Sequence, residues 1–179
     1  MDLRSYLSLL AICLIAAPAS AATYVVRPDG SGDFPTIQAA IDGALDGDII
    51  ELADGTFAGT GNRDLLWFSK TLTLRSQSGD PLRCVIDCEG SPTAHHSALS
   101  ADGAGDASVL AGITVTGGYT ASFGAVLLQR TSMTIQDCIF RGNHGVSGGG
   151  VTTNFYANPT LLRCTFWENT ASSGGAFCI

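Results

Sequence analysis

A unit of about 25 residues occurs three times in the second half of this chain, so the fold itself has to repeat with that period. The copies contain the segments 112–126 (GITVTGGYTASFGAV), 137–151 (DCIFRGNHGVSGGGV) and 163–177 (RCTFWENTASSGGAF). The last two segments are identical at six of fifteen positions. Repeats of this length are typical of solenoids, in which each unit buries its apolar face against its neighbours.

Apolar residues of the three copies fall into aligned columns. The spacing from Ile135 to Cys138 is three residues, and the spacing from Cys138 to Phe140 is two. The two-residue step is the alternation of a β-strand, and the three-residue step fits a corner between two short strands that both keep their apolar side inward. The columns are Leu110, Ile135 and Leu161; Ile113, Cys138 and Cys164; Val115, Phe140 and Phe166; and Val126, Val151 and Phe177.

These patterns predict an all-β fold, a parallel β-helix whose coils advance by one strand spacing, about 4.8 Å per turn. The segments 48–57, 65–76 and 84–90 are predicted to form earlier and less regular coils. Asn143 and Asn169 share one column at a corner, where stacked amides would hydrogen-bond along the axis. A ligand-binding role for these two asparagines is the alternative.

Upstream of the coils, the segment 34–48 has helical spacing. Its apolar face comprises Ile37, Ala40, Ile41, Ala44 and Leu45, with a proline near the start and a glycine past the end. We expect this helix to cover the first coil. The segment 90–108 is the longest stretch of polar and small residues, and we expect it to be a protruding loop.

The N-terminus has the pattern of a secretory leader. A short apolar run over residues 7–17 precedes a small-x-small site at 19–21, so we predict a signal peptide over residues 1–21 and a β-helix domain over residues 22–179. The predicted location is outside the cytoplasm: extracellular, periplasmic or on the outer-membrane surface. The mature part contains no apolar stretch of membrane-spanning length.

The net charge indicates which kinds of partner the protein can bind. The whole chain has 9 basic and 16 acidic residues, a net charge of −7, and its arginines do not cluster. An acidic surface without a basic stripe excludes nucleic acid as the expected partner. A polysaccharide or a cell-surface glycan is the partner we expect instead.

Five cysteines follow the predicted leader. Cys138 and Cys164 share an inward column, where parallel Cβ vectors favour stacked thiols over a disulfide, although a bridge is the alternative. Cys84 and Cys88 could bridge only around a corner, because an extended strand would hold them about 13 Å apart.

With these residues in hand, the chain resembles right-handed parallel β-helix proteins of the pectin-lyase-like class. The block 29–59 (DGSGDFPTIQAAIDGALDGDIIELADGTFAG) resembles the N-terminal cap and first coil of pectin methylesterases and of many secreted bacterial β-helix proteins. The later copies resemble the repeats of polymorphic outer-membrane proteins, which have a Phe-x-x-Asn element and a Gly-Gly-Ala-aliphatic element. Here these elements are 140–143, 166–169 and 174–177.

The resemblance to the esterases implies a catalytic coil, but the acid/base residue is replaced. The frame Cys138, Phe140 and Gly142 matches the family pattern. Gly145 and, one coil later, Ala171 stand where that pattern has its aspartate, and neither residue can transfer a proton. We therefore predict no catalytic residue within residues 22–179.

The sequence also lacks the residue patterns of other enzymes with this fold and of metal sites. Asp87, Glu89 and Asp137 could form the acidic calcium cluster of a pectate lyase only if distant coils met, so we interpret them as surface or turn carboxylates. The paired aspartates of polygalacturonases are missing. The histidines have no cysteine or carboxylate at metal-ligand spacing, and we predict no metal site and no cofactor. The histidines are His95, His96 and His144.

Residue 179 falls in the middle of a coil, so we expect further coils or a partner chain at this end, and a C-terminally incomplete domain. The leading hypothesis is an exported, non-catalytic scaffold that presents loops such as 90–108 for adhesion or glycan contact. One rival is a polysaccharide-active enzyme, of the pectin lyase or esterase kind, whose catalytic coils lie beyond residue 179. The other is a passenger module of an outer-membrane-anchored protein.

Overall fold

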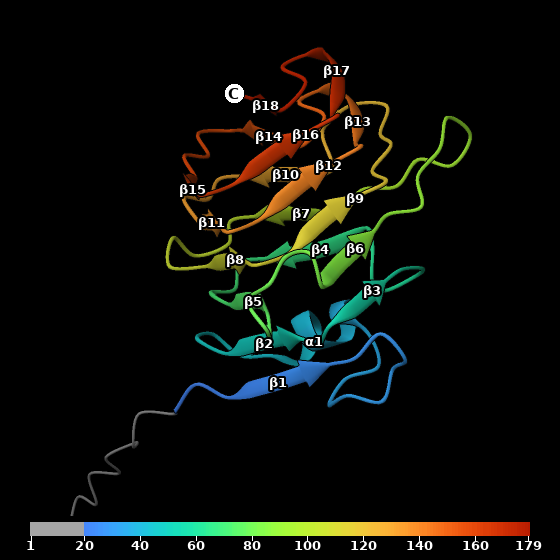
Figure 1. The fold of residues 1–179 in the computed structure, drawn as a ribbon. Coiled ribbons are helices and arrows are strands. Elements are labelled where there is room, and N and C mark those ends of the chain that lie inside the picture. The colour runs from blue at the N-terminus through green and yellow to red at the C-terminus, as the bar shows by residue number, and fades with distance from the viewer. Residues whose placement is uncertain (1–19) are drawn as a thin grey trace, which may run out of the picture.

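The computed structural model describes residues 20–179 of the chain (Figure 1). The leader predicted for residues 1–21 lies outside the described residues, apart from its last two positions. Within the described part of the chain, no helix is long and apolar enough to cross a membrane.

The described residues form a parallel β-solenoid of about six turns, which confirms the predicted fold class. Three parallel sheets make its walls, and the chain visits them in turn as it climbs from the blue to the red end in Figure 1. Sheet A comprises, in order, β1 (Thr23–Val26), β2 (Ile49–Leu52), β5 (Thr73–Ser76), β8 (Val109–Ala111), β11 (Thr134–Gln136) and β15 (Thr160–Leu162).

The other two walls and a short corner sheet complete the solenoid. Sheet B comprises β3 (Gly55–Phe57), β6 (Cys84–Asp87), β9 (Thr114–Thr116), β12 (Ile139–Arg141) and β16 (Thr165–Trp167). Sheet C comprises β4 (Leu65–Phe68), β7 (Leu99–Asp102), β10 (Val126–Gln129), β14 (Val151–Asn154) and β18 (Phe177–Cys178). A two-stranded sheet pairs β13 (His144–Ser147) with β17 (Thr170–Ser173).

The predicted columns are rows of neighbouring residues in the structure. Three columns consist of directly paired strand positions, one in each sheet, and the column that contains Cys138 lies at the corner between sheets A and B, one residue before the paired positions. The paired rows are Leu110, Ile135 and Leu161; Val115, Phe140 and Phe166; and Val126, Val151 and Phe177.

The core is therefore layered, with apolar side chains stacked on apolar side chains of the adjacent turns. The rings of Phe140 and Phe166 are stacked, with centroids 5.0 Å apart and an interplanar angle of 14°. Phe140 and Ile135 are fully buried, whereas Phe166 and Leu161 of the last described turn are half-buried. A fully buried side chain of this size contributes about 1.5–3 kcal/mol, so each added turn stabilises the one below it.

The three-residue step between strands has a specific backbone cause. Asp137 and Arg163, which lie between sheets A and B, have φ angles of 53° and 51°, in the left-handed region. Gly112 holds the same position one coil earlier, with φ of 67°. The left-handed residue turns the chain through the corner, so that the next inward column begins immediately after it.

The corner that follows sheet B is held by stacked asparagines, which we call the asparagine ladder. The structure confirms the predicted hydrogen bond between the stacked amides of Asn143 and Asn169. The Nδ2 of Asn143 donates to the Oδ1 of Asn169 over 3.0 Å and to the carbonyl of Val115 over 3.1 Å. Its Oδ1 accepts the backbone N–H of Gly118 over 2.8 Å. Asn143 is 1% exposed, so this side chain joins three successive coils inside the protein.

The N-terminal helix α1 (Ile37–Gly43) lies against the first turns, as the segment 34–48 predicts (Figure 1). Thr36 is its N-cap, and Ile37, Ala40 and Ile41 are buried. The prediction that Leu45 belongs to the buried face is wrong: Leu45 lies beyond the end of the helix and is 70% exposed.

A lysine ends α1. The Nζ of Lys70 donates to the carbonyls of Ile41, Asp42 and Ala44, over 2.8, 2.8 and 2.9 Å. These carbonyls have no partner within the helix, and a cation is favoured at this end of a helix. The only lysine of the chain thus joins the cap to the β4–β5 corner.

The prediction of one loop over residues 90–108 is partly wrong. Residues 99–102 form β7, a central strand of sheet C. The part before β7 protrudes (Figure 1), and it is tied back by two hydrogen bonds between the backbones of His96 and Tyr119, both 2.9 Å long. The small residues Ser100 and Ala101 concealed a strand, because the alternation of Leu99 and Ala101 is weak on the inward side.

All five cysteines of the described residues are free thiols, as favoured for Cys138 and Cys164. Burial raises the pKa of Cys138 to about 12, and it also raises the pKa of Cys84 to about 12. These two thiols therefore stay protonated and unreactive at neutral pH.

We predict that Asn143→Ala lowers the free energy of unfolding by about 2–4 kcal/mol, because the Gly118 N–H and the Val115 carbonyl lose their buried partner. Chemical denaturation followed by circular dichroism measures the change. Asn158→Ala is the matched control, since Asn158 is exposed, and it should be within about 0.5 kcal/mol of the unsubstituted protein. Equal effects of the two substitutions would contradict a structural role for the ladder.

Candidate functional site

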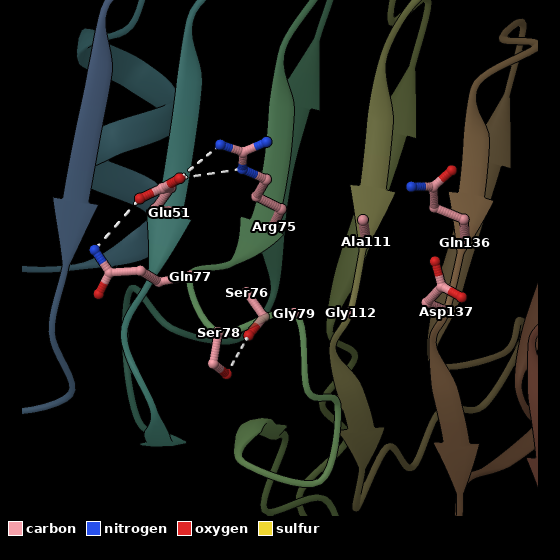
Figure 2. Close-up of a pocket in the computed structure, with 10 residues that line it drawn as sticks. All are labelled: Glu51, Arg75, Ser76, Gln77, Ser78, Gly79, Ala111, Gly112, Gln136 and Asp137. Atoms are coloured by element: carbon pink, nitrogen blue, oxygen red, sulfur yellow. Dashed lines mark hydrogen bonds and ion pairs between the residues drawn. The ribbon is translucent and has the colours of Figure 1, made fainter.

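The outer face of sheet A carries a groove of about 400 Å3, which Figure 2 shows in close-up. We name it the polar groove. It crosses β2, β5, β8 and β11 and includes the corners that follow three of these strands. Its lining residues are Glu51, Arg75, Ser76, Gln77, Ser78, Gly79, Ala111, Gly112, Gln136 and Asp137.

One outward row of sheet A forms the floor of the polar groove. Parallel pairing places Glu51 beside Arg75, Arg75 beside Ala111, and Ala111 beside Gln136. These residues alternate with the inward core positions of the same strands, so their side chains point to solvent. The methyl group of Ala111 leaves a depression between the longer side chains of Arg75 and Gln136 (Figure 2).

The depression continues into the corner at Gly112. A Cβ atom at this position would lie 3.3 Å from the carbonyl oxygen of Gly79 and 3.3 Å from the Cβ of Ser76. The φ of Gly112 is also positive, which favours glycine. Gly112 is itself buried, so the two corners are closely packed at the middle of the groove.

An ion pair closes one end of the groove. The Nη2 and Nε of Arg75 donate to the Oε1 of Glu51 over 2.6 and 3.2 Å, and the Nε2 of Gln77 donates to Oε2 over 3.3 Å (Figure 2). Beside it, the hydroxyls of Ser76 and Ser78 are 3.2 Å apart. This end therefore presents both hydrogen-bond donors and acceptors in fixed positions.

A second ion pair lies at the other end. Arg163 donates to both carboxylate oxygens of Asp137, from Nε over 2.6 Å and from Nη2 over 2.7 Å. These hydrogen bonds hold the pKa of Asp137 below its ordinary value and raise the pKa of Arg163. Asp137 is therefore a carboxylate at neutral pH, able to accept hydrogen bonds but not to act as a general acid.

The two carboxylates of the groove are too far apart for glycoside hydrolysis. Glu51 and Asp137 are separated by three strand spacings, about 14 Å. Hydrolysis by a carboxylate pair requires a separation of roughly 5–9.5 Å. The groove offers a row of hydrogen-bonding groups to a ligand, and this arrangement suits binding.

The structure does not bring the residues of the esterase frame into the polar groove. Gly145 lies on β13 and pairs with Ala171 on β17, at the corner beyond sheet B. Their backbones are closely packed: a Cβ atom at Gly145 would lie 2.1 Å from the carbonyl oxygen of Phe123. A larger residue is excluded there, so the glycine at this position has a packing role.

The three acidic residues considered as a calcium cluster each have a partner within the protein. The Oδ1 of Asp87 accepts the backbone N–H of Glu89 over 2.9 Å, and Glu89 forms an ion pair with Arg63. Asp137 pairs with Arg163, as described above. Over residues 20–179, no three His, Cys, Asp or Glu side chains are grouped as metal ligands.

The histidines form part of a lateral stack that the sequence did not indicate. The ring of Tyr119 stacks on His95 with centroids 5.7 Å apart and on His144 with centroids 4.3 Å apart. The Nδ1 of His96 is 2.7 Å from a carboxylate oxygen of Asp64. These contacts tie the loop before β7 to two other corners, which is a structural role.

Sequence reasoning missed the polar groove because its residues have no motif. Gln136 and Ala111 each follow a predicted inward residue, Ile135 and Leu110, so their outward direction was available from the alternation. What the sequence could not supply was the partner coil, because the spacing from β5 to β8 departs from the 25-residue period.

Comparison of the chain with models of protein families, with curated proteins and with solved structures finds no match. Strand pairing therefore establishes the fold, and the polar groove carries the case for a function.

We predict that the carboxyl carbon of Asp137 titrates with a midpoint below 3.8, the ordinary value, in NMR spectra recorded as a function of pH. Arg163→Gln should raise this midpoint toward 3.8. Because the folded pKa is lowered, the stabilisation by this pair is present above the ordinary pKa and is lost as the pH falls through the folded pKa.

Arg130→Gln is the control, since Arg130 pairs with Asp102 and not with Asp137. It should leave the Asp137 midpoint unchanged. A midpoint at or above 3.8 in the unsubstituted protein would show that the ion pair is not formed in solution.

Proposed function

We propose that this chain is an exported, non-catalytic β-solenoid scaffold that binds a polysaccharide or a cell-surface glycan in the polar groove. The observation that carries the proposal is the row Glu51, Arg75, Ala111 and Gln136, in which hydrogen-bonding side chains flank a depression. Sugar hydroxyls both donate and accept hydrogen bonds, and this row offers carboxylate, guanidinium and amide partners.

The size and place of the groove agree with a binding role. Its volume of about 400 Å3 lies within the range of roughly 300–1,000 Å3 that is usual for ligand pockets. It runs across four strands of a rigid sheet, so the groups that line it are held before the ligand arrives. A pre-formed row of this kind fits an extended polymer.

The polar groove replaces the segment 90–108 as the proposed contact surface. Polar groups of that segment are occupied within the chain: Ser91 and Ala94 pair through their backbones, and His96 is paired with Asp64. Export is supported by the leader pattern over residues 1–21, and the repeats that resemble those of polymorphic outer-membrane proteins support a location at the cell surface. The enzyme alternative has no comparable support, since the groove carboxylates are about 14 Å apart.

A glycan array, followed by titration calorimetry on the hits, tests the proposal. We expect at least one glycan to bind saturably. Ala111→Phe should weaken binding at least tenfold, because the ring fills the depression between Arg75 and Gln136. Val109→Phe is the matched control: Val109 also lies on the outer face of β8 but does not line the groove, so affinity should stay within twofold.

Two results would contradict the proposal. One is no saturable binding of any glycan by the folded protein. The other is equal binding by the Ala111→Phe variant and the unsubstituted protein, which would place the contact elsewhere on the surface. Thermal unfolding of both phenylalanine variants confirms that each is folded.

A further inference from the structure

A second groove, with different chemistry, lies on the outer face of sheet B. Its volume is about 240 Å3, and we name it the apolar groove. None of its lining residues carries a carboxylate or an amide side chain, in contrast to the polar groove. The lining residues are Leu82, Val85, Thr114, Ile139, Arg141, Thr165 and Trp167.

The floor of the apolar groove is a row of paired strand residues, and one rim is held by a hydrogen bond. Val85, Thr114, Ile139 and Thr165 are neighbours on successive strands of sheet B. The hydroxyl of Thr114 donates to the carbonyl of Pro81 over 2.7 Å. This bond fixes the loop before β6, so that Leu82 projects beside the floor while its side chain stays exposed.

Both rims expose large apolar side chains to solvent. Leu82 is 73% exposed and Trp167 is 54% exposed. An apolar side chain that entered between them would be covered on two sides and on the floor by Ile139. Burial of such surface is favourable, and exposed apolar patches of this kind commonly mark binding sites.

A cation without a carboxylate partner completes the groove. Parallel pairing places Arg141 directly beside Trp167 on the outer face. Within residues 20–179, Arg141 forms no ion pair, whereas five other arginines do: Arg63, Arg75, Arg83, Arg130 and Arg163.

The nearest carboxylate in the same row is too distant to neutralise this cation. Asp87 pairs with Thr116, and Thr116 pairs with Arg141, so Asp87 lies two strand spacings, about 10 Å, from Arg141. The Oδ1 of Asp87 is also occupied by the Glu89 N–H. Glu168, which follows Trp167, forms no ion pair with Arg141 within residues 20–179 either, so the guanidinium is available to an anion from solution.

From these contacts we infer that the apolar groove binds the C-terminal end of a peptide whose last residue is large and apolar. The last side chain lies between Leu82 and Trp167, and the terminal carboxylate receives paired hydrogen bonds from Arg141. Guanidinium and carboxylate match in geometry, and such charge-assisted bonds are among the strongest in proteins.

The shape of the groove selects this ligand over two others. Its volume is below the roughly 300–1,000 Å3 of pockets that enclose a whole ligand, so it takes one side chain of a longer chain and not a fatty acyl tail. A sugar would find few partners, because the Thr114 hydroxyl is already used and Thr165 offers the other hydroxyl. The inference is independent of glycan binding in the polar groove.

Tryptophan fluorescence provides a direct assay. The chain has two tryptophans, of which Trp67 is fully buried and Trp167 half-exposed. The probe is acetyl-Ser-Gly-Ser-Gly-Leu with a free carboxylate, and its matched control is the same peptide with a C-terminal amide. We expect the free acid to change the emission of Trp167 saturably, with a dissociation constant of about 0.1–1 mM, and the amide to bind at least tenfold more weakly.

Variants assign the signal to the two parts of the groove. Trp167→Phe should abolish the fluorescence change, and Arg141→Gln should weaken binding of the acid at least tenfold and remove the difference between acid and amide. The affinity of Arg141→Lys for the free acid should lie between those of the unsubstituted protein and of Arg141→Gln. Phe68→Ala, which removes a half-exposed ring from the outer face of sheet C, is the control and should change nothing.

The proposal is overturned if acid and amide bind equally, if neither binds at 10 mM, or if calorimetry shows unchanged binding by the Arg141→Gln variant. It is also overturned if an acidic oligosaccharide, such as a uronic acid trimer, produces the Trp167-dependent signal and the peptide does not. Ala111→Phe distinguishes this site from the proposed glycan site, because it should leave peptide binding unaffected.

Discussion

Parallel strand pairing in register holds the three walls of the solenoid together. Each strand of the repeats lies beside the equivalent residues of the next turn, so every inward side chain in these rows packs against apolar side chains of the adjacent turns. A slip by one residue would turn a whole row of core side chains to solvent. The stacked rings of Phe140 and Phe166 and the Asn143 ladder stabilise this register from the core and from a buried corner.

The same pairing organises the outside. Outward residues also stack into rows. One small residue in such a row therefore leaves a depression, and one charged residue without an ion pair lies beside known residues of the adjacent strands. Ala111 has the first effect in sheet A, and Arg141 has the second in sheet B. Sheets A and B of one solenoid therefore carry grooves with different lining residues, although the inward rows beneath both grooves are mostly apolar.

Much of the fold could be predicted from the sequence, because the inward rows repeat. The columns through Ile135, Phe140 and Val151 and the role of Asn143 follow from spacing alone. The backbone conformation of the corners was harder to predict from the sequence. Asp137 and Arg163 adopt left-handed φ angles, and among residue types only glycine clearly indicates such an angle. The sequence predicts a loop for residues 99–102 because Ser100 and Ala101 hide the alternation of β7. The outward rows do not repeat, so neither groove could be located before the coils were aligned.

Solution NMR can test the register directly, through scalar couplings across backbone hydrogen bonds. The structure predicts a coupling from the Ile139 amide to the Ile113 carbonyl and from the Thr165 amide to the Cys138 carbonyl, whose N···O distances are 3.0 and 2.9 Å. Both couplings together would establish that three successive turns are parallel and in register. Couplings displaced by one or more residues, or an antiparallel pattern, would contradict the stacking and with it the placement of both grooves.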